Sequence, residues 1–323
     1  MSQSEVRATA SAYRKWRQLK DGIATATITA GGVGVLLAIL LIFFYLLYEI
    51  MPLFQPASIQ SETQFQTNST ASALYLAMEE QAEISFRLGR NGDAEFFRLS
   101  DGNLLSETKL PLKGADILSF ALESEDSRIF ALGLSDGKVL IAKHDYRTSY
   151  PGGERLITPI LRFPYGDKAF LLSEGRPLEE VAISDNDDAL MIIGVTDGQL
   201  LGRRWVKEED FLSEEVTLSE QDVSLPVLDI IPSRVLIGPG QQWLYVLAAD
   251  GGFRLIDLPE QTITDRGYLF DNGKLSQARF LLGGISLLVA SDHGSVGQWF
   301  VVRDKERESG YKLQPVRQFD IPD

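Results

Sequence analysis

Residues 121–143 read ALESEDSRIFALGLSDGKVLIAK, and this stretch shows the pattern that decides the fold. A short apolar segment is followed by a polar turn, a strongly apolar segment, an Asp-Gly pair and another apolar segment. Asp-Gly between two apolar runs is a strong signal for a β-hairpin. The same pattern recurs without a gap as AISDNDDALMIIGVTDGQLLGRR (182–204) and VLIGPGQQWLYVLAADGGFRLID (235–257). The chain therefore contains an internal repeat built from short strands.

A fourth copy, QARFLLGGISLLVASDHGSVGQWFV (277–301), keeps this register as far as Asp292 and adds one residue, His293, in the turn. A weaker hairpin precedes the four copies and turns at Asn91-Gly92. We interpret the Asp and Gly residues of the copies as structural turn positions between strands. These positions are Asp136, Gly137, Asp197, Gly198, Asp250, Gly251, Asp292 and Gly294.

These copies predict a mainly β protein that contains a β-propeller of WD40-like repeats. Repeats of about 40–50 residues with several short strands each are typical of propeller blades, which bury their faces against one another. The Trp-Asp dipeptide of WD40 repeats is absent, although Trp205 and Trp299 stand close to its place. We expect four clear blades and one partial blade, in an incomplete ring rather than one closed with five. A β-sandwich or barrel is the alternative, because it also has regular short strands.

A second feature is an uncharged run, GIATATITAGGVGVLLAILLIFFYLLY, over residues 22–48. A transmembrane helix needs about 20 mostly apolar residues, so this run predicts a membrane anchor. The alternative is a cleaved signal peptide, whose apolar core would have about 7–15 residues and end in a small-residue cleavage site. This run is longer and is followed by Glu49-Ile50-Met51-Pro52-Leu53-Phe54, which favours an uncleaved anchor.

Basic side chains precede the apolar run, and an acidic chain follows it. The positive-inside rule then places the N-terminus in the cytoplasm and the main domain in the periplasm, with the anchor in a bacterial inner membrane. The residues that set this topology are Arg14, Lys15, Arg17 and Lys20. The expected parts are a cytoplasmic basic tail (1–21), a transmembrane anchor (22–54), a Gln/Ser/Thr-rich linker (55–74) and a periplasmic propeller-like domain (75–323).

Composition argues against several classes of function. The net charge is -14, and a strongly acidic chain does not suit the phosphates of nucleic acid. The absence of cysteine excludes disulfides, thiolate metal sites and thiol nucleophiles. We expect no cofactor and no bound metal.

Two motifs resemble catalytic or metal sites. Residues 133–137 match the G-x-S-x-G nucleophile elbow, but that motif needs a helix after the serine and KVLIAK reads as a strand. Ser135 is therefore predicted to be a turn residue, and no partner is evident for His144 or His293. Three aspartates lack the glycine and glutamate of a calcium loop and are predicted to form a polar turn: Asp185, Asp187 and Asp188. We expect that the chain is not an enzyme.

Small residues recur at four-residue spacing in the apolar run, at Ala30, Gly34 and Ala38. Such spacing lets membrane helices approach closely, which suggests packing in a complex of several helices. The alternative is that small residues are simply frequent in membrane helices. The sequence favours neither interpretation.

The segment KWRQLKDGIATATITAGGVGVLLAILLIFFYLLYEIMPLFQPA (15–57) resembles the first membrane segment of bacterial phosphate ABC transporter permeases of the PstC type. It is most similar to the enlarged proteobacterial form, which inserts a propeller-like periplasmic domain after the first helix. Arg17, Lys20-Asp21, Gly31-Gly32, LLIFFYLLY (40–48) and Pro52-Leu53-Phe54 carry the resemblance. It covers residues 12–57 closely and is architectural beyond them.

The resemblance implies an inner-membrane permease component that transports inorganic phosphate. Its partners would be another permease subunit, the ATPase subunits and a periplasmic solute-binding protein. Such permeases have several more membrane helices, so we expect residues 1–323 to be the N-terminal portion of one. The alternative is a single-span, membrane-anchored propeller that acts as a scaffold for protein–protein interactions in the envelope.

Overall fold

The computed structural model describes residues 3–54, 64–67, 69, 71–209, 216–281, 283–307 and 310–320. The chain divides into two compact units, Met1–Gln64 and Phe65–Asp323. Residues 3–54 of the first unit are helical, and every strand among the described residues belongs to the second unit. The predicted fold class, mainly β with one N-terminal apolar helix and a WD40-like β-propeller, is confirmed.

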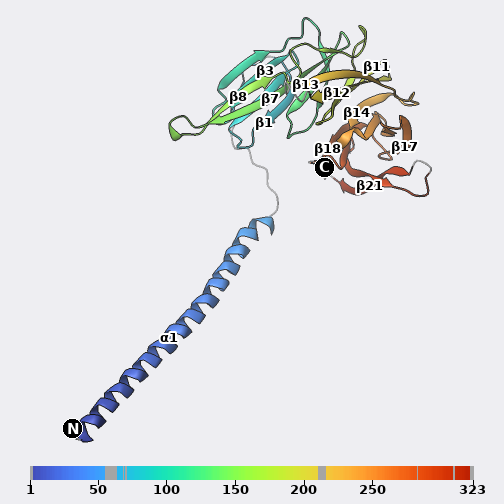
Figure 1. Ribbon diagram of the computed structural model, residues 1–323. Coiled ribbons are helices and arrows are strands. Elements are labelled where there is room, and N and C mark those ends of the chain that lie inside the picture. The colour runs from blue at the N-terminus through green and yellow to red at the C-terminus, as the bar shows by residue number, and fades with distance from the viewer. Residues whose placement is uncertain are drawn as a thin grey trace. The chain divides into compact units, whose positions relative to one another are not determined.

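The first unit consists of α1 (Gln3–Ile50), which is followed by the short 3-10 helix η1 (Met51–Phe54) (Figure 1). The segment Leu19–Phe54 is long and apolar enough to cross a membrane. Its apolar side chains are exposed on every side of the helix. A helix that is apolar all round must find its partners in lipid or in other helices.

The tail and the apolar run form one continuous helix, because α1 passes through residues 21 and 22 without a break. Three threonines at the start of the run donate their hydroxyls to backbone carbonyls four residues earlier, at 2.8 to 2.9 Å: Thr25, Thr27 and Thr29. These hydroxyls are thus satisfied within the helix and do not need water.

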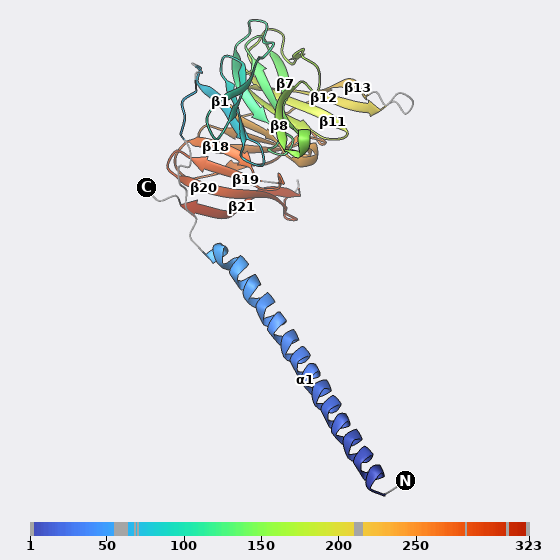
Figure 2. The same cartoon turned by 90° about the vertical axis from the view of Figure 1, so that its left-hand side faces the viewer.

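The second unit contains five antiparallel sheets, which we call blades 1 to 5 in chain order (Figures 1 and 2). Blade 1 contains β1 (Ala73–Met78), β2 (Ile84–Gly89), β3 (Asp93–Arg98) and β4 (Leu104–Lys109). Blade 2 contains β5 (Ile117–Leu122), β6 (Ile129–Leu134), β7 (Lys138–Ser149), β8 (Leu156–Arg162) and the short β9 (Phe170–Leu171), with η2 (Pro151–Gly153) between β7 and β8. Blade 3 contains β10 (Glu180–Asp185), β11 (Ala189–Thr196), β12 (Gln199–Glu209) and β13 (Val216–Val223). Blade 4 contains β14 (Pro232–Ile237), η3 (Pro239–Gln241), β15 (Trp243–Ala248), β16 (Gly252–Asp257) and β17 (Thr262–Tyr268). Blade 5 contains β18 (Leu275–Phe280), β19 (Leu287–Ser291), β20 (Ser295–Arg303) and β21 (Tyr311–Asp320).

Each blade is a meander, because its four main strands are hydrogen-bonded in chain order. The first strand of blade 3, β10, contacts the first strands of blades 2 and 4, β5 and β14, so the first strand of a blade lies innermost. A sandwich would have two large sheets and a barrel would have one closed sheet. Five separate sheets, each with four main strands, are instead the architecture of a propeller.

Four apolar core clusters hold the blades together, and each cluster joins two consecutive blades. The second strands of blades 2 and 3, β6 and β11, are buried along their whole length because they have a neighbouring blade on both sides. Fully burying one large apolar side chain contributes about 1.5–3 kcal/mol. Each cluster contains residues of both blades that it joins: Phe86 and Phe130 in the first, Ile141 and Ile192 in the second, Ile193 and Val246 in the third, and Leu255 and Leu287 in the fourth.

Blade 1 has all four strands, whereas the sequence showed only a partial copy at its place. Its β2–β3 turn contains Asn91-Gly92 instead of Asp-Gly, and its central strands contain Arg87 and Glu95. These charges interrupt the apolar pattern that identified the other blades.

Four blades share one turn geometry between their second and third strands. In each, a glycine with positive φ donates its amide to the carbonyl three residues earlier, which closes a tight turn. These glycines are Gly92, Gly137, Gly251 and Gly294. Blade 3 instead has a two-residue turn, in which both Asp197 and Gly198 have positive φ.

The predicted alignment of the fourth copy is wrong by one residue. In blades 4 and 5 the turn glycine donates its amide to the carbonyl of Ala248 and of Ser291, respectively. The residues directly before these carbonyls form the cross-strand pairs Leu247↔Phe253 and Ala290↔Val296, so these two pairs are equivalent. His293 therefore corresponds to Asp250, and no residue is inserted in this turn. The sequence alignment matched Asp292 with the aspartates of the other copies. The position of the turn, however, is set by the glycine that has positive φ.

The expected linker, 55–74, is only partly described, since 55–63, 68 and 70 lie outside the described residues. Its last part belongs to the propeller unit. The ring of Phe65 packs against Gly102, where an added Cβ would come within 2.5 Å of it, and β1 already begins at Ala73.

Candidate functional site

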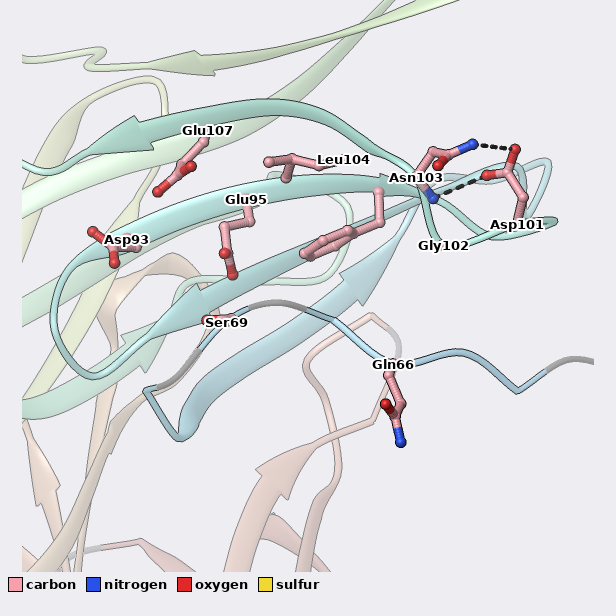
Figure 3. Close-up of a pocket in the computed structure, with 10 residues that line it drawn as sticks. Gln66, Ser69, Asp93, Glu95, Asp101, Gly102, Asn103, Leu104 and Glu107 are labelled. Atoms are coloured by element: carbon pink, nitrogen blue, oxygen red, sulfur yellow. Dashed lines mark hydrogen bonds between the residues drawn. The ribbon is translucent and has the colours of Figure 1, made fainter.

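A cavity of about 440 Å³ lies on the face of blade 1 that points away from blade 2 (Figure 3). Strands β3 and β4 and the turn between them form one wall, and the segment before β1, with Gln66 and Ser69, forms another. Four carboxylates line it, and they are Asp93, Glu95, Asp101 and Glu107. The cavity is thus polar and acidic.

A buried ion pair lies at the base of this cavity. Arg87 of β2 donates to Glu95 of β3 at 2.5 Å, and both residues are less than a tenth exposed. Arg87 also donates to the hydroxyl of Ser69 and to the carbonyl oxygen of Ala71. These bonds hold the segment before β1 against the face of the blade.

Two more carboxylates of the cavity have local partners. The backbone and side-chain amides of Asn103 donate to Asp101 at 2.9 and 2.8 Å (Figure 3). These bonds, together with Arg98, hold the pKa of Asp101 below its ordinary value. Asp93 lies 3.5 Å from the ammonium of Lys109. Within the described ranges, no group of three or more His, Cys, Asp or Glu residues is placed to hold a metal ion.

An aromatic cluster with a histidine is buried between blades 1 and 2. His144 of β7 stacks on Phe86, with ring centroids 4.7 Å apart and ring planes 11° apart. Its Nε2 lies 3.5 Å from the hydroxyl of Tyr75. The Nδ1 of His144 and the hydroxyl of Tyr146 are buried and have no hydrogen-bond partner among the described residues.

Burial, together with the positive charges of Arg128 and Lys143, lowers the pKa of His144 to about 4, and the negative charge of Asp145 opposes this shift. The imidazole is therefore neutral at neutral pH. A smaller cavity of about 220 Å³ lies beside the cluster and is lined by Arg128, Tyr146 and the hairpin of β7 and β8. His144 itself is 2% exposed, so its packing is that of a core residue.

A second buried titratable group, Glu180, lies at the interface of blades 3 and 4. Arg234 of β14 donates to Glu180 of β10 at 2.9 Å. Burial nevertheless raises the pKa of Glu180 to about 7, because desolvation outweighs the attraction of Arg234. This pair joins two inner strands.

Three of the four predicted turn aspartates accept hydrogen bonds from backbone amides. Asp136 accepts from the amide of Lys138 at 3.3 Å, and Asp250 accepts from the amide of Gly252 at 3.0 Å. Asp292 occupies a different position and accepts from the amide of Lys274 at 2.7 Å. Asp197 has positive φ and lies 3.6 Å from Arg176.

Ser135 is the counterpart of Asp292 in blade 2. Its hydroxyl accepts from the amide of Asp116 at 3.0 Å, and strand β7 follows the turn. No helix follows it, so the geometry differs from a nucleophile elbow. His293 lies on an exposed turn, 3.8 Å from Asp292.

The remaining predicted residues lie apart from the cavities. Asp185 accepts from Lys207 at 2.7 Å and from Tyr165 at 2.6 Å, so it has structural partners. Ala30, Gly34 and Ala38 are exposed on α1. Arg14, Lys15, Arg17 and Lys20 belong to the first half of α1, and the ammonium of Lys20 lies 3.7 Å from the ring centroid of Trp16.

Sequence reasoning missed the Arg87–Glu95 pair and the histidine cluster. Both residues of the pair stand in alternating strand positions that normally face water, so nothing local marked them as buried. Equal spacing from the turn glycine was an available signal: Arg87 and Glu95 occupy the positions that Leu132 and Leu140 occupy in blade 2.

No family model matches the chain, and no curated protein matches it. Among solved structures, the chain is similar to the β-propeller domain of Cps50 (Swd1) from Myceliophteria thermophila. The two are 12% identical, the match covers 79% of this chain and 74% of that chain, and the TM-score is 0.46.

Proposed function

We propose that this chain is a membrane-anchored β-propeller that serves as a binding platform for other proteins of the cell envelope. The observation that carries the proposal is the presence, in one chain, of an apolar helix long enough to cross a membrane and a unit of five blades. Propellers commonly use rigid blades to present loops and hairpins to partners. The N-terminus would lie in the cytoplasm and the propeller in the periplasm.

The outer hairpin of blade 2 supports a role in protein binding. Strand β7 has 12 residues, twice the length of β6, and extends with β8 to a tip at η2. At this tip Tyr150 is 67% exposed and Leu156 is 51% exposed. Exposed aromatic side chains are frequent anchors of protein interfaces.

In-cell crosslinking tests this proposal. The wild-type chain should give adducts with envelope proteins that Tyr150→Ser/Leu156→Ser loses, because the double variant removes the apolar tip. Thr262→Ser, on the exposed outer strand of blade 4, is the matched control and should keep them. The same adducts from residues 1–64 alone would show that the helix, and not the propeller, makes these contacts.

A second candidate function is that of a permease component of an ABC transporter for inorganic phosphate. The observation that favours it is the sequence of 12–57, which resembles the first membrane segment of PstC-type permeases. In this function α1 would pack on other membrane helices through Ala30, Gly34 and Ala38. Its partners would be a second permease subunit, the ATPase subunits and a solute-binding protein.

Co-purification from membranes, together with phosphate uptake, tests this second function. The wild-type chain should retain an ATPase subunit, and Gly34→Leu should reduce that retention because the larger side chain separates the helices. Val35→Leu, one position further along α1, is the control and should have no effect. Retention of no ATPase subunit by wild type, with phosphate uptake unchanged when the gene is deleted, would contradict the permease function.

A further inference from the structure

The hairpin of β7 and β8 projects beyond the rest of blade 2, and its two faces have different surroundings (Figure 1). Side chains alternate between the two faces along each strand. One face contains Tyr146 and Ile157, which pack against the core cluster of blades 1 and 2. Near the tip, Arg155 donates to Gln81 of blade 1 at 3.1 Å and pairs with Glu83. This face is therefore fixed on blade 1, and the hairpin presents its other face in a defined orientation.

The presented face combines cations with apolar side chains. Strand pairing places three cations on it, Lys143, Arg147 and Arg162, and two apolar side chains, Leu156 and Ile160. One carboxylate and two hydroxyls complete the face, from Asp145, Ser149 and Thr158. Neither Leu156 nor Ile160 belongs to a core cluster of the described residues, so both are available to a partner.

The cations of this face outnumber its one carboxylate. Asp145 lies 2.9 Å from Arg162 and 3.9 Å from Arg128 of the neighbouring loop. Lys143 stands directly opposite Arg162 across the two strands, and like charges in such a pair repel each other. Among the described residues, Lys143 and Arg147 have no ion-pair partner. The face therefore has an excess of positive charge.

This positive charge contrasts with the rest of the chain. Residues 143–162 contain four basic and two acidic side chains, whereas the whole chain has a net charge of -14. His144, on the fixed face of β7, also responds to this charge. Burial is the main cause of its lowered pKa, and the charges of Arg128 and Lys143 add to the shift and outweigh Asp145. A basic surface on an acidic chain is suited to an acidic partner.

We propose that this presented face binds a protein segment that has carboxylates on both sides of an apolar side chain. The pair Asp145↔Ile160 lies between the levels of Lys143 and Arg147 along the strands. The apolar side chain of the partner would contact Ile160, and its carboxylates would pair with the two cations. The inference rests on the proposed binding-platform function and names the chemistry of the partner at the same hairpin.

An anionic lipid surface is the competing occupant of this face. Lipid headgroups would meet the tip of the hairpin first, and the tip contains Glu154 beside Arg155. The unpaired cations lie instead along the stem, on both sides of Ile160, where a segment that lies along the strands reaches them. The position of the charges thus favours a protein segment.

Peptide binding to the full chain tests this inference. The chain is placed in nanodiscs of zwitterionic phosphatidylcholine. The probes are the fluorescent peptide Glu-Glu-Leu-Glu-Glu-Leu-Glu-Glu and its counterpart with glutamine in place of every glutamate. The variant Lys143→Glu/Arg147→Glu reverses two charges of the presented face. Lys113→Glu/Lys274→Glu is the matched control, because it reverses two charges on exposed loops between other strands.

We expect the acidic peptide to bind at least about tenfold more tightly than the neutral one, and to lose at least about tenfold in affinity for Lys143→Glu/Arg147→Glu but not for the control. Higher salt should weaken the binding to wild type, because it screens exposed charges. Equal affinities for the two peptides, or equal losses in the variant and the control, would overturn the inference. If the wild-type nanodiscs then float with phosphatidylglycerol vesicles and the variant nanodiscs do not, the face binds lipid headgroups instead.

In-cell crosslinking separates a failure of this inference from a failure of the platform function. We expect Lys143→Glu/Arg147→Glu to lose the same adducts as Tyr150→Ser/Leu156→Ser. If only the second variant loses them, the platform function is supported and the charged docking face is overturned. If both variants keep them, the platform function itself is contradicted.

Discussion

His144 makes the propeller sensitive to acid at the scale of a single residue. Its pKa is about 4 in the folded chain, below the ordinary value of 6.5 that applies when the chain is unfolded. Between these values the unfolded chain binds the proton more strongly, so the free energy of unfolding falls as the pH drops from about 6.5 to about 4. The whole loss from this group is about 3 kcal/mol, and it does not grow below about pH 4.

The variant His144→Phe should remove this pH dependence, because phenylalanine can stack on Phe86 without titrating. Urea unfolding at several pH values between 7.5 and 4.5 measures the slope. His293→Gln, on an exposed turn, is the control and should keep the wild-type slope. An unchanged slope in His144→Phe would mean that other groups control the acid sensitivity.

The Arg87–Glu95 pair gives a second prediction at this scale. Arg87→Ala would leave the Glu95 carboxylate buried without its partner, so it should lower the free energy of unfolding by about 3–5 kcal/mol. The double variant Arg87→Leu/Glu95→Leu copies the Leu132–Leu140 pair of blade 2 and should cost less than the single change. Urea unfolding compares them, and a double variant less stable than Arg87→Ala would contradict this account of the pair.

At the scale of elements, replacing different turn glycines by alanine should cost different amounts of stability. Gly137 has a φ of +82°, and an added Cβ would come within 2.1 Å of the carbonyl oxygen of Ser173. Gly198 has a φ of +72° but open space around it. Gly198→Ala should therefore cost about 1–2 kcal/mol, from the left-handed backbone alone. Gly137→Ala should cost more than about 3 kcal/mol, because the backbone near β9 must also move.

Thermal unfolding of the two alanine variants, side by side, measures this difference. Equal losses of stability would mean that the contact with Ser173 is not a constraint in solution.

The elements also show what the sequence could predict. The strands around Asp136-Gly137 and Asp250-Gly251 were predictable because the turn chemistry and the apolar runs agree. The register of blade 5 was not, because alignment follows side-chain identity, whereas turn geometry depends on which residue can take positive φ. The burial of Arg87 and Glu95 was also hidden, since it depends on a segment that folds back over blade 1.

At the scale of the whole molecule, the repeat predicted a propeller, and the uncharged run predicted an apolar helix long enough to cross a membrane. The number of blades depends on interfaces between distant parts of the chain. Such interfaces leave no local pattern, which is why a blade with charged central strands was expected to be partial. The topology of the anchor and the partners of the propeller stay predictions.

The most direct test of a membrane-anchored propeller is the sidedness of two single cysteines in intact bacterial spheroplasts. The two variants are Thr148→Cys in the propeller and Ser4→Cys near the N-terminus, each treated with a membrane-impermeant maleimide before and after lysis. The account predicts that Thr148→Cys reacts in intact spheroplasts, that Ser4→Cys reacts only after lysis, and that alkaline carbonate does not extract the chain. Labelling of Thr148→Cys only after lysis, or release of the chain by carbonate, would contradict it.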